Sequence, residues 1–178
     1  GISPLRVNEG IIVSLNSATA VTNAIYDYLI DIDDQNVPMP RLARRWTVSD
    51  DGLTYKLFLF SDVDFHSGHS LSTADVVWSI NRLRNSEELF IYHKYENILT
   101  IKEEIPNAIV FQLKKPNPFF LYDLADNQAI IMRQGEENIL NYNGTGPFKI
   151  ERISEEKGIV LKRNLNYFGK IPNVKKLN

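Results

Sequence analysis

The sequence predicts an α/β fold in which helices accompany mixed β-sheets, and three observations lead to this prediction. Several short runs alternate between inward and outward side chains, which is the two-residue period of a strand. One run has the three- to four-residue apolar spacing of a helix. Turn residues separate these runs at short intervals. The 178 residues suffice for one domain or two small ones, at roughly 100–200 residues per domain.

The stretch from Pro40 to Leu83 has the densest pattern and begins as a hairpin. Trp46 and Val48 alternate on a short strand, and residues 53–60 alternate on the strand that returns. Asp50–Gly52 lies between them, and its glycine tolerates the positive φ that tight turns require. We therefore expect two antiparallel strands here.

A capped helix follows the hairpin. Ser72 offers a hydroxyl N-cap, and Asp75 places a carboxylate in the first turn, where the helix dipole favours negative charge. Three apolar residues then recur at i, i+4 and i+7 and are expected on one buried face: Val76, Ile80 and Leu83.

The remaining elements follow from the same two periods. A helix is expected over residues 17–32, capped by Ser17 or Thr19. The aromatic segment 90–95 fits either a helix or a loop. A helix is expected to begin near Phe119, and the segment 134–140 has room for one short helix. Strands are expected over 98–103, 108–113, 148–153 and 159–163.

Composition excludes several kinds of site. The net charge is −2 and no Lys/Arg cluster stands out, which argues against a nucleic-acid partner because phosphate binding needs a basic face. The chain has no cysteine, which excludes disulfides and thiolate metal sites. No apolar run approaches the roughly 20 residues that span a bilayer. A signal peptide is not recognised at Gly1, so the sequence is expected to be a trimmed part of a longer one.

Candidate catalytic and metal sites are weak. His66 and His69 flank Gly68, which favours a turn over the helix that would aim both rings at one ion. A Gly-x-Ser-x-Gly nucleophile elbow is absent. Four acidic residues could suggest a hydrolytic pair, but each lies at a hairpin end where Asp forms turns: Asp50, Asp51, Asp62 and Asp64. We expect no catalytic residue, no metal site and no cofactor.

The motifs of the central stretch resemble those of a known family. Pro40-x-Leu42-Ala43-x-x-Trp46 is followed by Ser-Asp-Asp-Gly-Leu-Thr-Tyr at 49–55, by Phe65-His66-x-Gly68, and by Thr-Ala-Asp-Val-Val at 73–77. Ile-Tyr-Asp-Tyr-Leu at 25–29, Gly-Thr-Gly-Pro-Phe at 144–148 and the ending at 163–169 resemble further motifs of it. The chain is identified as similar to the family 5 extracellular solute-binding proteins, the dipeptide, oligopeptide and nickel receptors of ABC importers.

This resemblance implies a lobe of the type II periplasmic-binding-protein fold that is incomplete, because the second lobe is absent. Residues 1–32 would begin the first lobe, 33–138 would form a smaller appended α+β domain, and 139–178 would return to the first lobe. Residues 134–140 would replace a longer segment with helices in other members.

The implied function is capture of a peptide or similar small ligand outside the cytoplasmic membrane and its delivery to an ABC permease. The receptor would not be an enzyme. It would be periplasmic or extracellular, free or lipid-anchored, and monomeric. An alternative is the ligand-sensing domain of a transcriptional regulator with a solute-binding-like fold; an enzyme such as a peptidase is a third.

The resemblance also implies ligand-binding positions. Glu9, Gly10 and Ile11 would run beside the peptide backbone. Tyr92 would contact the peptide, and Asp126 or Asn127 would reach the cleft.

Overall fold

A computed structural model describes residues 6–7, 10–11, 18–154 and 158–170 of the chain. Its helices are α1 (Ala18–Ile25), α2 (Thr73–Arg84), α3 (Leu89–Tyr95), α4 (Phe120–Asp123) and a 3-10 turn η1 (Ile139–Asn141). Its strands are β1 (Arg6–Val7), β2 (Gly10–Ile11), β3 (Ile30–Ile32), β4 (Pro38–Pro40), β5 (Ala43–Val48), β6 (Thr54–Leu59), β7 (Ile98–Glu104), β8 (Ala108–Leu113), β9 (Phe148–Ser154) and β10 (Gly158–Arg163).

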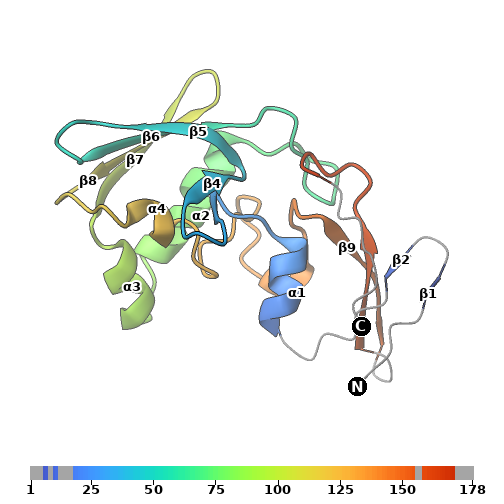
Figure 1. Cartoon of the computed structure of the whole chain (residues 1–178). Coiled ribbons are helices and arrows are strands. Elements are labelled where there is room, and N and C mark those ends of the chain that lie inside the picture. The colour runs from blue at the N-terminus through green and yellow to red at the C-terminus, as the bar shows by residue number, and fades with distance from the viewer. Residues whose placement is uncertain (1–5, 8–9, 12–17, 155–157, 171–178) are drawn as a thin grey trace.

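The strands form two four-stranded sheets and one small ribbon within the described residues. One sheet has the order β5-β6-β8-β7, the other has the order β1-β2-β10-β9, and β3 pairs with β4. In Figure 1 the β5–β8 sheet lies at the upper left with α2 beneath it, and the β9 and β1–β2 strands lie at the right. Helix α1 lies between these two parts. No helix in the described part of the chain is long and apolar enough to cross a membrane.

The pairing is antiparallel for every described strand pair, which corrects the expectation of mixed sheets. The physical reason is the length of the connections. The β5–β6, β7–β8 and β9–β10 partners are joined by short turns, whereas a parallel pair needs a crossover of a dozen or more residues. The combination of helices and sheets is otherwise as predicted.

The predicted hairpin and its core face are confirmed. Strand β6 alternates between half-buried and buried side chains, with Tyr55, Leu57 and Leu59 inward. Phe111 on β8 is fully buried and meets Phe120 with ring centroids 5.3 Å apart. The outward face of the hairpin carries Phe58 and Arg45; the guanidinium carbon lies 3.5 Å from the ring centroid of Phe58.

Helix α2 begins as the sequence predicts. The Ser72 side chain accepts a hydrogen bond from the Asp75 backbone N–H, and the Asp75 carboxylate accepts one from the Ser72 N–H, which completes a capping box. Val76, Ile80 and Leu83 are buried against the sheet. The hydrophobic core of this part of the molecule thus lies between the β5–β8 sheet and helix α2.

The predicted helix over 17–32 is wrong in its second half. Helix α1 ends at Ile25, and Ile30–Ile32 is strand β3. The carbonyl of Tyr28 accepts from the Leu42 N–H at 3.1 Å and that of Leu29 accepts from the Ala43 N–H at 2.9 Å. These long-range bonds replace the i→i+4 bonds that a longer helix would need. The Ser17 cap lies outside the described residues.

The other predicted elements agree with the structure. The ambiguous aromatic segment is helix α3, and the short helices α4 and η1 lie where helices were expected. Four strands match within a residue or so: β7, β8, β9 and β10.

Candidate functional site

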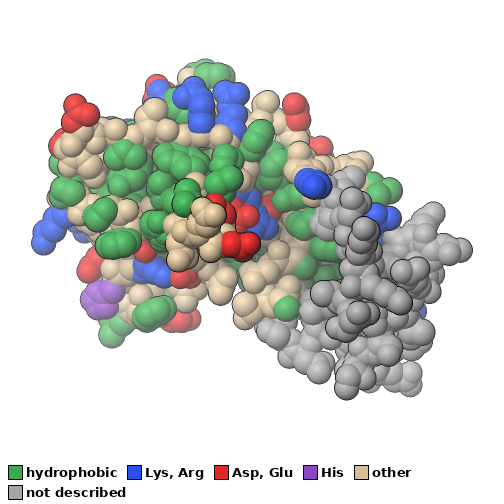
Figure 2. Space-filling view, in the orientation of Figure 1, with side chains coloured by type: hydrophobic (Ala, Val, Ile, Leu, Met, Phe, Trp, Pro, Cys, Tyr) green, Lys and Arg blue, Asp and Glu red, His purple; other side chains and the backbone are tan. Residues whose placement is uncertain are grey.

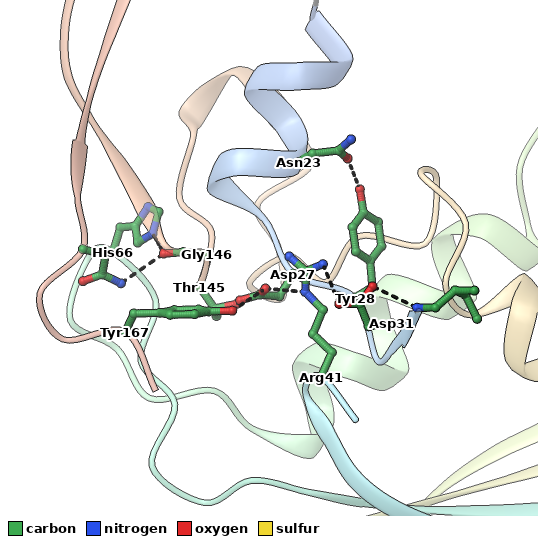
Figure 3. Close-up of polar contacts among 11 residues, drawn as sticks. Asn23, Asp27, Tyr28, Asp31, Arg41, His66, Thr145, Gly146 and Tyr167 are labelled. Carbon is green, nitrogen blue, oxygen red and sulfur yellow. Dashed lines mark hydrogen bonds and ion pairs between the residues drawn. The ribbon is translucent and has the colours of Figure 1, made fainter. Parts of the chain in front are cut away.

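A buried carboxylate, Asp27, connects its own segment to three others where α1 meets β4 and the β9–β10 hairpin (Figure 3). Asp27 is 0% exposed. Its Oδ1 accepts from Arg41 Nε at 2.7 Å and from the Tyr167 hydroxyl at 3.2 Å, and its Oδ2 accepts from Thr145 Oγ1 at 2.9 Å. The donors satisfy both oxygens, which is the condition for burying a charge at tolerable cost. We call Asp27, Arg41, Thr145 and Tyr167 the junction network.

Two glycines allow the backbone of residues 144–146 to approach the end of α1. A Cβ at Gly144 would lie 2.0 Å from the Ile25 carbonyl oxygen, and one at Gly146 would lie 2.5 Å from it. The Gly146 N–H donates to this same carbonyl at 2.8 Å, which satisfies a group that α1 leaves open at its C-terminus. The Gly-Thr-Gly motif therefore packs two backbone segments together.

His66 connects the turn at 65–68 to the same backbone segment, residues 144–146. Its backbone N–H donates to the Gly144 carbonyl at 2.8 Å, and its Nε2 lies 2.9 Å from the Gly146 carbonyl. A carbonyl only accepts, so Nε2 carries the proton. Burial lowers the pKa of His66 more than this hydrogen bond raises it, so the ring is held neutral. His69 is exposed and its Nδ1 lies 3.1 Å from Ser67 Oγ.

The two histidines of this turn have few other ionisable side chains around them that could share a metal ion. The described part of the chain contains no group of three His, Cys, Asp or Glu side chains that could hold an ion. His66 Nε2 is occupied by a carbonyl, and its Nδ1 is buried without a hydrogen-bond partner among the described residues. The contacts of His66 hold this turn against the backbone of Gly144 and Gly146.

The electrostatics of the junction network keep Arg41 charged and Tyr167 protonated. Burial alone would lower the pKa of Arg41, but the Asp27 carboxylate outweighs it and the pKa is raised. Burial, followed by the negative charge of Asp27, raises the pKa of Tyr167, so the hydroxyl stays a donor. Arg41 also lies over the ring of Tyr28, with its guanidinium carbon 5.2 Å from the centroid. The network is suited to holding segments together.

A surface pocket of about 370 Å³ opens beside this network. Arg41 Nη1 reaches its rim, 3.9 Å from an Asp31 carboxylate oxygen. Figure 2 shows acidic side chains gathered over the β3–β4 ribbon in the middle of this face, with basic ones beside them. The pocket is lined by Asp31, Pro40, Arg41, Phe60, Pro147, Tyr167, Phe168, Gly169 and Lys170.

The predicted ligand-binding tyrosine lies on α3. Tyr92 is 37% exposed, and its ring centroid lies 5.5 Å from that of His93. Phe90 on the same helix is also exposed, whereas Tyr95 is fully buried and donates to the Asp123 carbonyl at 2.9 Å. Of these three aromatics Tyr95 has a structural contact, whereas the exposed Tyr92 hydroxyl has no hydrogen-bond partner among the described residues.

Asp126 and Asn127 lie in the turn after α4. The Asp126 carboxylate is paired with Lys94 of α3, and it also accepts from the Gln128 N–H at 3.0 Å. Asn127 is exposed. The turn and helix α3 are therefore tied together, which brings three of the six predicted residues to one flank of the molecule.

The other predicted segment lies elsewhere. Glu9 is outside the described residues, and Gly10 and Ile11 form β2 between β1 and β10. Figure 1 shows β2 and α3 at opposite sides of the molecule, with α1 between them. A ligand that contacted both would have to be extended. The ligand-binding role of all six residues stays a prediction.

Sequence reasoning missed the junction network and the Lys94–Asp126 pair. One signal for the network was present: an acidic residue stands inside the apolar motif Ile-Tyr-Asp-Tyr-Leu at 25–29. A buried acid needs partners, and the partners of Asp27 come from motifs at 40–43, 144–148 and 163–169. The motifs that carry the resemblance thus meet in space.

Comparison with known proteins identifies relatives of this chain. Residues 37–178 match the model of bacterial extracellular solute-binding proteins, family 5 Middle. A dipeptide-binding protein of Escherichia coli (strain K12) is 28% identical over 97% of this chain and 38% of its own length. A peptide transport periplasmic protein, SapA, of Salmonella typhimurium is 27% identical over 91% of this chain and 34% of its length.

A solved protein structure is also similar to this chain. The periplasmic binding protein DppA of Helicobacter pylori, in complex with the peptide STSA, is 26% identical with a TM-score of 0.71, over 89% of this chain and 37% of that one. The chain thus spans a little over a third of the length of these relatives. The family model covers most of the chain, and the chain belongs to the family 5 bacterial extracellular solute-binding proteins.

Proposed function

We propose that this chain is part of the substrate-binding component of a peptide-type ABC importer. The observation that carries the proposal is the family match over residues 37–178, together with relatives named for dipeptide binding and peptide transport. The protein captures a peptide outside the cytoplasmic membrane, in the periplasm or at the cell surface, free or lipid-anchored. It delivers the peptide to the permease subunits as a monomer and performs no chemistry.

Capture rests on closure between two lobes. Residues 1–32 and 139–178 contribute to the first lobe, and 33–138 form the appended domain. The ligand stabilises the closed state through its higher affinity for that state. Tyr92 and Asn127 provide an exposed aromatic ring and an amide on one flank, and Asp126 is paired there with Lys94. This combination suits the amides and charged ends of a peptide. The segment Glu9, Gly10 and Ile11 lies beside the peptide backbone.

The test is calorimetry on the longer protein that contains this chain. A mixed pool of di- to pentapeptides is expected to bind with a dissociation constant of about 1 μM or tighter. Nickel–histidine and a monosaccharide serve as the other ligand classes. Saturable binding of either one, with no heat from peptides, would replace the peptide assignment.

A further inference from the structure

The surface pocket beside the junction network has a largely buried cation, Arg41, among its lining groups. Its volume of about 370 Å³ is near the lower end of the usual range for ligand pockets, which suits a molecule with one ring. Its lining comes from the β3–β4 ribbon and from the segment after β10, rather than from α3 and β2, where the peptide contacts are predicted. A ligand in this pocket would therefore be separate from a peptide bound at those elements.

The guanidinium of Arg41 is held in a fixed orientation at this pocket. Its Nε donates to the buried Asp27 carboxylate at 2.7 Å, and its central carbon lies 5.2 Å from the ring centroid of Tyr28. The side chain is 19% exposed, so most of it is enclosed while part of it still reaches the pocket. Because these contacts already set its position, little side-chain entropy would be lost when a ligand binds to it.

Arg41 also has hydrogen-bond donors that no described residue uses. Among the N–H groups of its guanidinium, only the one on Nε donates to Asp27. The Asp31 carboxylate lies 3.9 Å from Nη1, which is an ion-pair distance but is too long for a hydrogen bond. The terminal nitrogens are not among the buried polar atoms that lack a partner in the described residues, so a ligand can reach them. Parallel N–H groups in one plane match the two oxygens of a carboxylate.

Aromatic rings and prolines provide the apolar part of the lining. Phe60 is 39% exposed, and its ring centroid lies 5.6 Å from that of Phe168, which in turn lies 4.8 Å from that of Tyr167. Pro40 and Pro147 add further apolar surface. An exposed aromatic ring beside a fixed cation favours a ligand with a flat apolar body over a small inorganic ion, which could not use the ring.

We propose that this pocket binds an organic carboxylate that carries one flat apolar ring. The carboxylate oxygens accept from the terminal N–H groups of Arg41, and the ring packs against Phe60 and Phe168. The exposed Lys170 adds a second positive charge to the lining, whereas the Asp31 carboxylate repels the incoming one. The site is built from residues of this chain and does not depend on the proposed importer function.

The experiment is an NMR titration of the 178-residue chain with benzoate. It follows the Arg41 Nε–H and the ring protons of Phe60 and Phe168. We expect saturation with a dissociation constant of about 1 mM, which is reasonable for so small a ligand. Benzyl alcohol keeps the ring and lacks the charge, and acetate keeps the charge and lacks the ring. Each is expected to bind about tenfold more weakly than benzoate.

A variant that gains affinity tests the contact with Arg41. Asp31→Asn should tighten benzoate binding about threefold, because it removes a partly exposed negative charge beside the guanidinium. Partial unfolding could not produce such a gain. Asp34→Asn is the matched control: it removes the same charge from an exposed position in the β3–β4 turn and should leave the affinity unchanged. Equal affinities in the two variants would overturn the proposed contact.

A second variant tests the aromatic wall. Phe60→Ala should weaken benzoate binding about fivefold and leave acetate binding unchanged, because only benzoate has a ring to pack. Phe119→Ala, at a phenylalanine that is 66% exposed beside α4, is the control and should bind benzoate normally. No saturating shift at about 10 mM benzoate would overturn the proposal. Displacement of benzoate by an equal concentration of sulfate would also overturn it, since the pocket would then bind anions of any kind.

Discussion

Asp27 is the residue whose replacement should disturb this structure most. We expect Asp27→Asn to lower the free energy of unfolding by about 3–5 kcal/mol, because it leaves the largely buried Arg41 without its counter-charge. The measurement is chemical denaturation, read as a shift in midpoint at constant slope.

Asp31→Asn is the control for this change. Asp31 lies 3.9 Å from the same guanidinium, but its side chain is 56% exposed. An exposed pair contributes at most about 1 kcal/mol. Equal losses in the two variants would show that Asp27 has no special role in the junction network.

His66 should make stability depend on pH. Its folded-state pKa lies below the ordinary value of about 6.5, so the unfolded chain takes up a proton more readily. The contribution is fully present above about pH 6.5 and is lost as the pH falls through the folded-state pKa. Denaturation midpoints measured between about pH 8 and pH 5 check this.

The glutamine variant isolates the histidine contribution. His66→Gln keeps an N–H donor for the Gly146 carbonyl and removes the titration, so the pH dependence should flatten. His69→Gln, at an exposed ring, should retain the full slope. Identical slopes in the two variants would contradict the assignment.

The junction network shows why a site can escape a sequence-based prediction. The partners of Asp27 lie 14, 118 and 140 residues away along the chain. Local periodicity reports only neighbours within a turn or two, so it indicates a helix through Asp27 and is silent on these pairs. The sequence shows that an acidic residue lies in an apolar motif. It does not show which groups donate hydrogen bonds to that residue.

At the scale of elements, α2 is expected to be the most sensitive part of the core. Ile80 is 0% exposed against the β5–β8 sheet, and Ile80→Ala should cost about 2–5 kcal/mol through lost burial and the cavity left behind. The melting temperature and the denaturation midpoint should both fall.

A control for Ile80→Ala comes from the other sheet. Ile153 on β9 is 59% exposed, and Ile153→Ala should change stability by less than about 0.5 kcal/mol. An unchanged melting temperature for Ile80→Ala would show that this face of α2 is not core.

Elements with local signals were predictable, and those set by distant contacts were not. The β5–β6 hairpin and α2 contain their own turn and cap, so their sequence suffices. Helix α1 carries an apolar stripe that continues into β3. Distant backbone N–H groups, from Gly146, Leu42 and Ala43 among others, bond to the carbonyls that a longer helix would use. The antiparallel order of the sheets likewise depends on pairing between segments.

At the scale of the whole molecule, the two four-stranded sheets differ in how the chain builds them. The sheet β5-β6-β8-β7 comes from one continuous stretch, residues 43–113. The sheet β1-β2-β10-β9 combines both ends of the described chain. The chain therefore passes between these parts twice, and the junction network joins both passages, since Asp27 lies in one and Thr145 in the other. The two passages are thus held to each other by hydrogen bonds.

The same arrangement leads to a prediction about binding. The chain spans 38% of the dipeptide-binding relative and 37% of the peptide-bound structure. A receptor that encloses its ligand gains affinity by burying most of the ligand surface, and one lobe leaves much of that surface in water. We expect the 178-residue chain to bind di- to pentapeptides at least about a thousandfold more weakly than the longer protein, a loss of about 4 kcal/mol.

Calorimetry on both proteins, with the same peptide pool, measures this difference. In the longer protein, Tyr92→Ala should weaken binding, because the ring buries ligand surface and the hydroxyl offers a hydrogen bond. Tyr122 on α4 is equally exposed, at 38% against 37%, but donates its hydroxyl to the Asn36 carbonyl at 2.8 Å. Tyr122→Ala is the control, and it should bind normally provided that its melting temperature is unchanged. Micromolar binding by the 178-residue chain would mean that the cleft is complete within it, and an unaffected Tyr92→Ala variant would move the peptide contact away from α3.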